Sequence, residues 1–141
     1  MNKILNVSFI PKSSDFGLLI LRLFIGLDML FNHGLAKLQN FSAMVGMFGN
    51  PGMDVLHLGG GITATLVVVA EVLASAMLVL GIATRLSALI FSINMAVAFF
   101  GVHHASLAQG PHSGEIAFLY LAGSLTLLFA GSGRFALSKS E

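Results

Sequence analysis

The sequence contains no cysteine, and only 9% of its 141 residues carry a charge. The absence of cysteine excludes disulfides, cysteine-ligated iron–sulfur clusters, c-type haem attachment and thiol chemistry carried out by this chain itself. The scarcity of charge argues against a soluble domain, in which about 25% of residues are charged, and equally against a disordered chain. The net charge of +1 offers no basic surface for nucleic acid, which we exclude as a partner.

What the sequence has in excess is apolar residues, at 56% of the total. A chain this short cannot bury so much apolar surface within itself. Four segments come close to the roughly 20 mostly apolar residues that cross the hydrocarbon core as a helix, namely residues 16–36, 61–81, 84–102 and 115–132. The sequence therefore predicts an all-α fold, an integral membrane four-helix bundle that forms a single domain over residues 1–141 and has the lipid membrane as its first partner.

The distribution of basic residues predicts how these spans are oriented. With four spans, both termini and the turn at residues 82–83 share one side of the membrane, while the connections at 37–60 and 103–114 share the other. The first side holds five basic residues and the second holds only Lys37; the five are Lys3, Lys12, Arg85, Arg134 and Lys139. The positive-inside rule then places both termini in the cytoplasm.

The connection between the first two spans contains a further helical pattern. Phe41, Met44, Val45 and Phe48 recur at the spacing of one helical face. This pattern predicts a short amphipathic helix between spans 1 and 2. Such a helix either lies in the membrane interface or caps the bundle with its apolar face.

Three charged residues fall well inside the predicted spans, away from their ends, where charge is costly: Arg22, Asp28 and Glu71. When depth is counted from the span ends at about 1.5 Å per residue, Glu71 lies within a few ångströms of the level of the other two. We predict a buried cluster in which Arg22 bridges towards Glu71 or Asp28 and leaves one carboxylate suited to proton transfer. The alternative is a neutral structural clamp between two helices. Asn94, midway along the third span, either joins this cluster or forms a plain interhelical hydrogen bond.

The histidines all fall on the predicted outer side; they are His33, His57, His103, His104 and His112. His33 ends the first span at the level where His103 and His104 end the third, and imidazoles placed there would donate hydrogen bonds to a quinone carbonyl. Imidazoles also bind metals and haem, but no pair has the i, i+4 spacing of a metal motif, so we predict no metal site. Solvation of these histidines in the interface is the remaining alternative.

An ordered series of short motifs resembles the DoxX family. The series begins with Leu21-Arg22-Leu23, Gly26, His33-Gly34, Lys37-Leu38 and Pro51, and it continues with Glu71, Thr84-Arg85, His103-His104 and Gly131-Ser132-Gly133-Arg134. The resemblance covers about residues 15–137. It implies a four-helix protein of the bacterial inner (plasma) membrane. Relatives occur with a terminal quinol oxidase, with thiosulfate:quinone oxidoreductase and in complexes that handle oxidative or thiol stress.

The resemblance thus implies a subunit of a quinone-linked redox complex that works with other protein subunits. By motif it carries over Arg22, His33, Lys37, Glu71, Arg85 and His103. Together with the reasoning from the residues, this gives a proton-exchanging set, Glu71, Asp28 and Arg22, and a quinone-binding set, His33, His103, His104 and Lys37. Two alternatives are a non-catalytic scaffold that anchors an oxidoreductase and a small transporter. The sequence leaves open whether this chain itself is the enzyme.

Overall fold

The computed structural model describes residue 7, residues 9–110 and residues 113–138, and every regular element in these ranges is a helix. The all-α prediction is therefore confirmed for this part of the chain. Lys3, His112 and Lys139, which entered the predictions above, lie outside the described residues. In chain order the elements are α2 (Ser14–Asp28), η1 (Met29–Gly34), α3 (Leu35–Gln39), α4 (Phe41–Phe48), α5 (Gly60–Val68), η2 (Val69–Ala74), α6 (Ser75–Leu80), α7 (Thr84–Ala96), η3 (Val97–Val102) and α8 (Glu115–Ala130).

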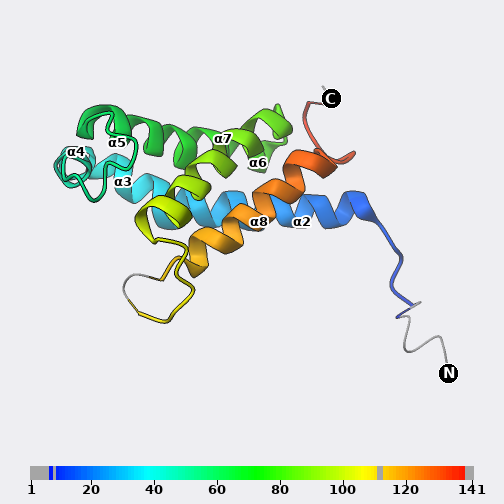
Figure 1. The fold of residues 1–141 in the computed structure, drawn as a ribbon. Helices are drawn as coiled ribbons and strands as arrows, with labels where there is room; N and C mark the ends of the chain where they lie inside the picture. The colour runs from blue at the N-terminus through cyan, green and yellow to red at the C-terminus, as the bar shows by residue number, and fades with distance from the viewer. Residues whose placement is uncertain (1–6, 8, 111–112, 139–141) are drawn as a thin grey trace.

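Several of these elements join end to end into longer helices (Figure 1). One runs over residues 14–39, and two others are Gly60–Leu80 and Thr84–Val102. Each contains one π-helical turn, η1, η2 or η3. Gly60–Leu80 and Thr84–Val102 are long and apolar enough to cross a membrane, whereas Glu115–Ala130 is apolar but shorter. The helices coincide with the four predicted segments to within a few residues at each end, and the number that crosses a membrane stays a prediction.

In Figure 1, α3 and α4 lie at one end of the molecule, and the start of α2 and the α6–α7 turn lie at the other. At the second of these ends, the backbone N–H of Arg134 donates to Asp15 Oδ1 at 3.1 Å, and the N–H of Ser138 donates to the Gly81 carbonyl at 3.1 Å. These bonds bring the C-terminal segment to the start of α2 and to the α6–α7 turn, as the predicted topology requires. Gly81 ends α6 in the left-handed conformation, with φ +69°, which glycine adopts without steric cost.

Two glycines set how the 14–39 helix packs against Gly60–Leu80. A Cβ atom placed on Gly34 would lie 2.5 Å from the Glu71 carbonyl oxygen, and one placed on Gly26 would lie 2.6 Å from Val79 Cγ2. The Gly26 Cβ atom would also lie 3.0 Å from the Ser75 carbonyl oxygen, so the two helices approach closely at both glycines. The helices are antiparallel, with Gly34 level with Glu71 and Gly26 level with Val79.

Small and hydroxyl-bearing residues join α7 to α8. Ser92 Oγ donates to Ser124 Oγ at 2.8 Å in the buried interior, and Ala88, Phe91 and Leu127 are fully buried beside them. Small residues allow close packing of helices that share an apolar environment. This interface forms the centre of the core.

The predicted amphipathic helix is present as α4 (Phe41–Phe48). It packs against the start of α5, where a Cβ atom on Gly60 would lie 2.2 Å from the Val45 carbonyl oxygen. Phe48, at the end of the helix, is buried. Of the two alternatives, this packing matches a helix that caps the bundle with its apolar side.

Replacing Gly34 by alanine is expected to lower the free energy of unfolding by about 1–3 kcal/mol, because the new Cβ atom would collide with the Glu71 carbonyl oxygen. Gly17→Ala is the matched control, since nothing lies within 4 Å of a Cβ atom there and alanine is the better helix former. The thermal unfolding midpoints of the two variants, each purified in mild detergent, measure these changes in stability. Equal stability of the two variants would contradict the contact at Gly34.

Candidate functional site

A cavity of about 320 Å³ lies at the end of the molecule that holds α4. Its volume falls in the range of small-molecule binding sites. The walls are mostly apolar and come from α4, the following segment, α5, α7 and η3; they include Met47, Phe48, Val55, Leu56, Leu66, Val67, Ile90, Ile93, Val97 and Val102. The polar groups in the lining belong to Lys37, Thr63, Glu71, Asn94 and His103.

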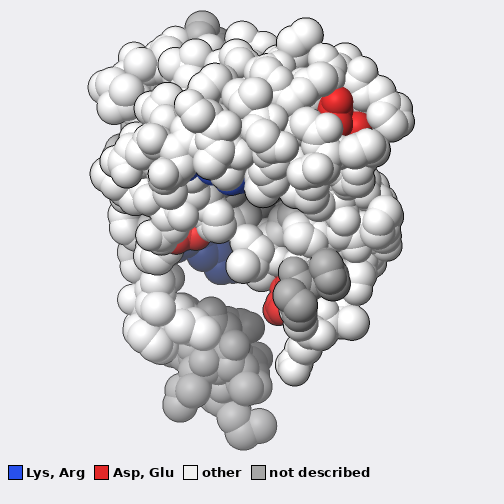
Figure 2. All heavy atoms as spheres, turned by 90° about the vertical axis from the view of Figure 1, so that its left-hand side faces the viewer, with Lys and Arg blue, Asp and Glu red and all other residues white. Residues whose placement is uncertain are grey.

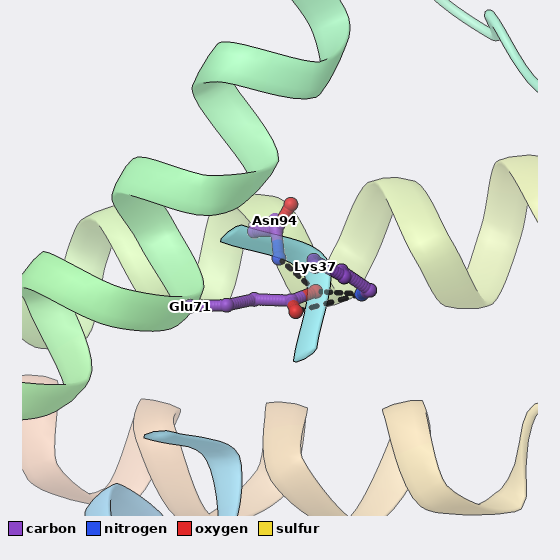
Figure 3. A network of polar contacts seen from close by, with 3 residues as sticks. All are labelled: Lys37, Glu71 and Asn94. Carbon is purple, nitrogen blue, oxygen red and sulfur yellow. Dashed lines mark hydrogen bonds and ion pairs between the residues drawn. The ribbon is translucent and has the colours of Figure 1, made fainter. Parts of the chain in front are cut away.

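Three of these polar side chains converge from three different helices (Figure 3). Lys37 Nζ, from α3, donates to both carboxylate oxygens of Glu71 in η2, at 2.5 and 2.6 Å. Asn94, from α7, donates to Glu71 Oε1 over a longer 3.4 Å. The Glu71 side chain is only 5% exposed and that of Lys37 is 27% exposed. The carboxylate is thus buried with its charge partner beside it, as a buried charge requires.

This arrangement offers a ligand both hydrogen-bond donors and a proton-exchanging group. The ammonium of Lys37 is a donor only, the carboxylate of Glu71 accepts when ionised, and the amide of Asn94 does both. Glu71 lies in the π-helical turn η2, and π-helical turns are common at functional sites. A molecule with a carbonyl head and an apolar body would match the lining.

The predicted quinone-binding residues divide between separate places. Lys37 and His103 line the cavity. His104, the next residue, is exposed and has a left-handed backbone with φ 50°. His33 lies away from the cavity, with its ring 5.9 Å from that of Tyr120 in an edge-on contact. The structure therefore brings two of the four predicted residues together.

The predicted cluster of Arg22 with Glu71 or Asp28 is wrong in its geometry. Glu71 forms its ion pair with Lys37, whereas Arg22 is buried near the opposite end of the 14–39 helix and donates from Nη2 to the Phe135 carbonyl at 3.1 Å. The error came from counting depth from the span ends. The contact at Gly34 shows the true register, which places Glu71 about 18 Å along the helix from Arg22, at about 1.5 Å per residue.

Asp28 takes part in a second polar cluster on another face. The Tyr120 hydroxyl donates to Asp28 Oδ2, and Asn32 Nδ2 donates to Oδ1 at 2.5 Å. An open groove of about 420 Å³ between α2 and α8 runs past Asp28, His33 and Tyr120. The three members of the predicted proton-exchanging set therefore lie in three different environments.

Asp54 holds the chain segment that leads from α4 to α5 beside the cavity. Its carboxylate accepts hydrogen bonds from Thr63 Oγ1 at 2.7 Å and from the backbone N–H groups of Leu58 and Gly59 at 3.1 and 2.6 Å. The hydrogen bond from Thr63 is the main cause that lowers the pKa of the Asp54 carboxyl below its usual value, although partial burial acts in the opposite direction.

Two of these residues, Tyr120 and Asp54, were not predicted as site residues. Tyr120 is the only tyrosine in the sequence and stands in an otherwise apolar segment, which is a signal for a polar contact at depth. Asp54 precedes the start of α5 by six residues, and an acidic residue shortly before a helix is a common capping signal. The six residues between Asp54 and the start of α5 are too many for a standard helix cap, so this signal did not identify Asp54 as a site residue.

Comparison with known proteins gives two kinds of match. The DoxX family model matches residues 17–104. An "Uncharacterized protein" of Haemophilus influenzae is 36% identical over 117 residues, covering 77% of this chain and 79% of the relative. The "Putative oxidoreductase CatD" of Bacillus subtilis is 28% identical over 126 residues, covering 89% and 87%. No solved structure gives a significant match.

The lowered pKa of Asp54 makes the order of this segment depend on pH. Because the folded-state pKa is the lower one, the contribution of the carboxylate is complete above the unfolded pKa of about 3.9 and is lost as the pH falls through the folded pKa. Hydrogen exchange of the Leu58 and Gly59 amides should therefore show protection that declines below about pH 4.

Asp54→Asn is expected to speed this exchange near neutral pH and to remove its pH dependence, because an amide offers a single uncharged oxygen acceptor. Glu115→Gln, which removes an exposed carboxylate elsewhere, is the control. Unchanged protection in Asp54→Asn would show that the carboxylate does not hold the segment.

Proposed function

This chain belongs to the DoxX family, and from this membership we propose that it is an integral membrane subunit of a quinone-linked redox complex. DoxX proteins are membrane proteins, and the Bacillus subtilis relative is named as an oxidoreductase. The finer parts of the proposal concern the membrane-spanning bundle, its orientation and the quinone.

We propose that four helices cross the membrane, the first and the last together with Gly60–Leu80 and Thr84–Val102. The surface supports this placement, since large apolar side chains point outward: Phe24, Phe100 and Phe129 are 74, 62 and 81% exposed. Figure 2 shows that even the end holding α4 consists almost entirely of uncharged residues. A soluble protein rarely exposes so much apolar surface, whereas lipid covers it at no cost.

We further propose that both termini lie in the cytoplasm, with the chain in the bacterial inner membrane. Among the described residues, Lys12 precedes α2, Arg85 lies at the start of α7, and the N–H of Arg134 donates to Asp15 in α2, so these three belong to the end where α2 begins and α6 meets α7. Lys37, in α3, belongs to the end that holds α4. This asymmetry follows the positive-inside rule. The cavity then opens towards the outer side of the membrane.

Single cysteines test this orientation without background, because the natural sequence has none. Gln109→Cys and Lys12→Cys both replace exposed residues, one in each end of the molecule. A membrane-impermeant maleimide applied to intact spheroplasts is expected to label Gln109→Cys fully and Lys12→Cys only after lysis. Labelling of Lys12→Cys before lysis would contradict the orientation, and labelling of neither after lysis in detergent would signal misfolding of the variants.

The single observation that supports quinone binding is the cavity, because it combines apolar walls with convergent polar groups at Lys37, Glu71, Asn94 and His103. A quinone has an apolar ring and chain and two carbonyl oxygens that accept hydrogen bonds. Lys37, Asn94 and His103 would donate to such a carbonyl. The isoprenoid chain would leave along the apolar walls towards lipid.

A quinone supplies two-electron chemistry, since it takes up two electrons and two protons to become the quinol. In this proposal Glu71 exchanges the protons, and Lys37 stabilises its ionised form. The electrons come from a partner oxidoreductase subunit. The chain therefore binds and protonates the quinone while the partner carries out the electron transfer to it.

The second candidate function is that of a non-catalytic subunit that docks an oxidoreductase to the membrane. The exposed carboxylate of Asp28 on the α2–α8 face favours it. A charged group on the outer surface of a membrane helix is costly in lipid and is stabilised when a partner protein covers it. The two functions are compatible, since they use different residues: the cavity and the α2–α8 groove share none of their lining residues.

The neighbouring histidines provide a matched test of quinone binding. His103→Asn is expected to reduce the quinone that co-purifies in mild detergent by up to about tenfold, since a lost hydrogen bond costs about 0.5–1.5 kcal/mol and 1.4 kcal/mol is about tenfold. His104→Asn should retain the quinone content of the natural protein, because His104 is exposed and asparagine tolerates its left-handed backbone.

Quinone is quantified per protein chain by extraction and mass spectrometry. An equal quinone content in both variants, or none in the natural protein purified from native membranes, would argue that the cavity holds another ligand.

A further inference from the structure

Outside the cavity, the feature that most indicates a further interaction site is the Asp28 carboxylate on the α2–α8 face. The Asp28 residue is exposed, although two side chains donate hydrogen bonds to it, Tyr120 to Oδ2 and Asn32 to Oδ1. Both donors are uncharged. The carboxylate is therefore held in one position and oriented. His33 lines the same groove, but no lysine or arginine among the described residues forms an ion pair with Asp28.

The surroundings of this carboxylate are apolar. The groove beside it is lined by Phe24, Ile116 and Leu119, whose exposed fractions are 74, 59 and 61%. Gly26, two residues before Asp28, packs against Ser75 and Val79. Asp28 lies 14 residues after the start of the 14–39 helix and 11 residues before its end, which places it about 21 and 16 Å from the two ends at about 1.5 Å per residue.

In a membrane, a carboxylate at this depth faces lipid. An ionised side chain at the bilayer centre is costly and is normally paired or turned inward. Asp28 is not turned inward, because Tyr120 and Asn32 hold it at the surface of the molecule. A cation from outside the chain would remove the cost.

A second copy of this chain does not supply that cation from the described helices. Arg22 is fully buried and bonded to the Phe135 carbonyl. Lys37 is committed to Glu71. Arg85, at the start of α7, donates to the Leu128 carbonyl. His33 is the remaining titratable group that faces Asp28, and it is half-buried against Tyr120.

We propose that the α2–α8 face around Asp28 docks a transmembrane helix of a different protein, and that this helix carries a lysine or arginine at mid-membrane depth. The basic side chain pairs with Asp28, and the helix backbone lies over the groove between Phe24 and Leu119. This inference rests on the proposed membrane placement of the chain. It identifies the partner by chemistry: a membrane-spanning subunit with one basic residue in its hydrocarbon-spanning segment.

The test uses synthetic transmembrane helices of polyleucine as probes, with either lysine or leucine at the central position. The full-length protein, labelled through Gln109→Cys, is reconstituted into phosphatidylcholine vesicles with labelled probe, and association is measured by fluorescence energy transfer. The lysine probe is expected to associate at least tenfold more tightly than the leucine probe. Asp28→Asn should bring both probes to the same affinity. Glu115→Gln, which removes an exposed carboxylate at the start of α8, should leave the difference between the probes intact.

A third probe keeps the test independent of the folding of any variant. Moving the lysine from the centre of the probe to a position near its end should abolish the preference, because the cation then no longer reaches the level of Asp28. Equal binding of the central-lysine and leucine probes to the natural protein would overturn the proposal. Persistence of the preference in a folded Asp28→Asn protein would also overturn it.

Self-association is measured in the same vesicles with donor- and acceptor-labelled protein. Self-association that depends on Asp28 would overturn the proposal in favour of a second copy. Extraction of the natural protein by alkaline carbonate would refute the membrane placement as well as the docking site. Loss of the lysine preference in a protein that resists extraction refutes the docking site alone.

Discussion

The arrangement of charges in this molecule depends on a close contact between two backbones. Gly34 lies against the Glu71 carbonyl, where any side chain would collide. Because the helices meet at that point, Lys37, three residues further along, reaches the Glu71 carboxylate. Arg22, twelve residues earlier, lies instead at the α6–α7 turn, where Gly81 makes room for it. One steric constraint thereby determines which cation enters the cavity and which one joins the C-terminal segment to the helices.

The helices and their grouping at the two ends could be predicted from the sequence because both are local properties. Apolar runs, turn residues and the spacing of Phe41, Met44, Val45 and Phe48 depend on neighbouring residues only. The register between helices is not local. Counting from assumed span ends placed Glu71 opposite Arg22, but the first helix extends beyond its predicted end to Gln39. That extension carries Lys37 to the level of Glu71.

The site could be predicted only in part for a similar reason. The end of the bundle to which a residue belongs can be estimated from the ends of a span, and Lys37 and His103 were both assigned to one end, where they line the same cavity. The direction in which a side chain points around its helix cannot be estimated this way, so His33 and His104 were grouped with residues that they do not meet. The cavity wall from the irregular segment before α5 depends on the hydrogen bonds of Asp54, which link residues four to nine positions apart. No periodic pattern in the sequence predicts these hydrogen bonds.

The wide turn η1 between Asp28 and Leu35 has a consequence for how the sequence tolerates changes in length. A π-helical turn contains one residue more than the α-helical turn it replaces, so deletion of one residue within Met29–Gly34 would restore a regular helix. The residues beyond the turn would keep nearly the same direction around the helix. Gly26 and Gly34 would then be seven residues apart, and seven residues of a regular helix turn by about 700°, within about 20° of two full turns. Both glycines would still face the neighbouring helix. The wide turn therefore gives this stretch a tolerance for the loss of one residue that a regular helix lacks.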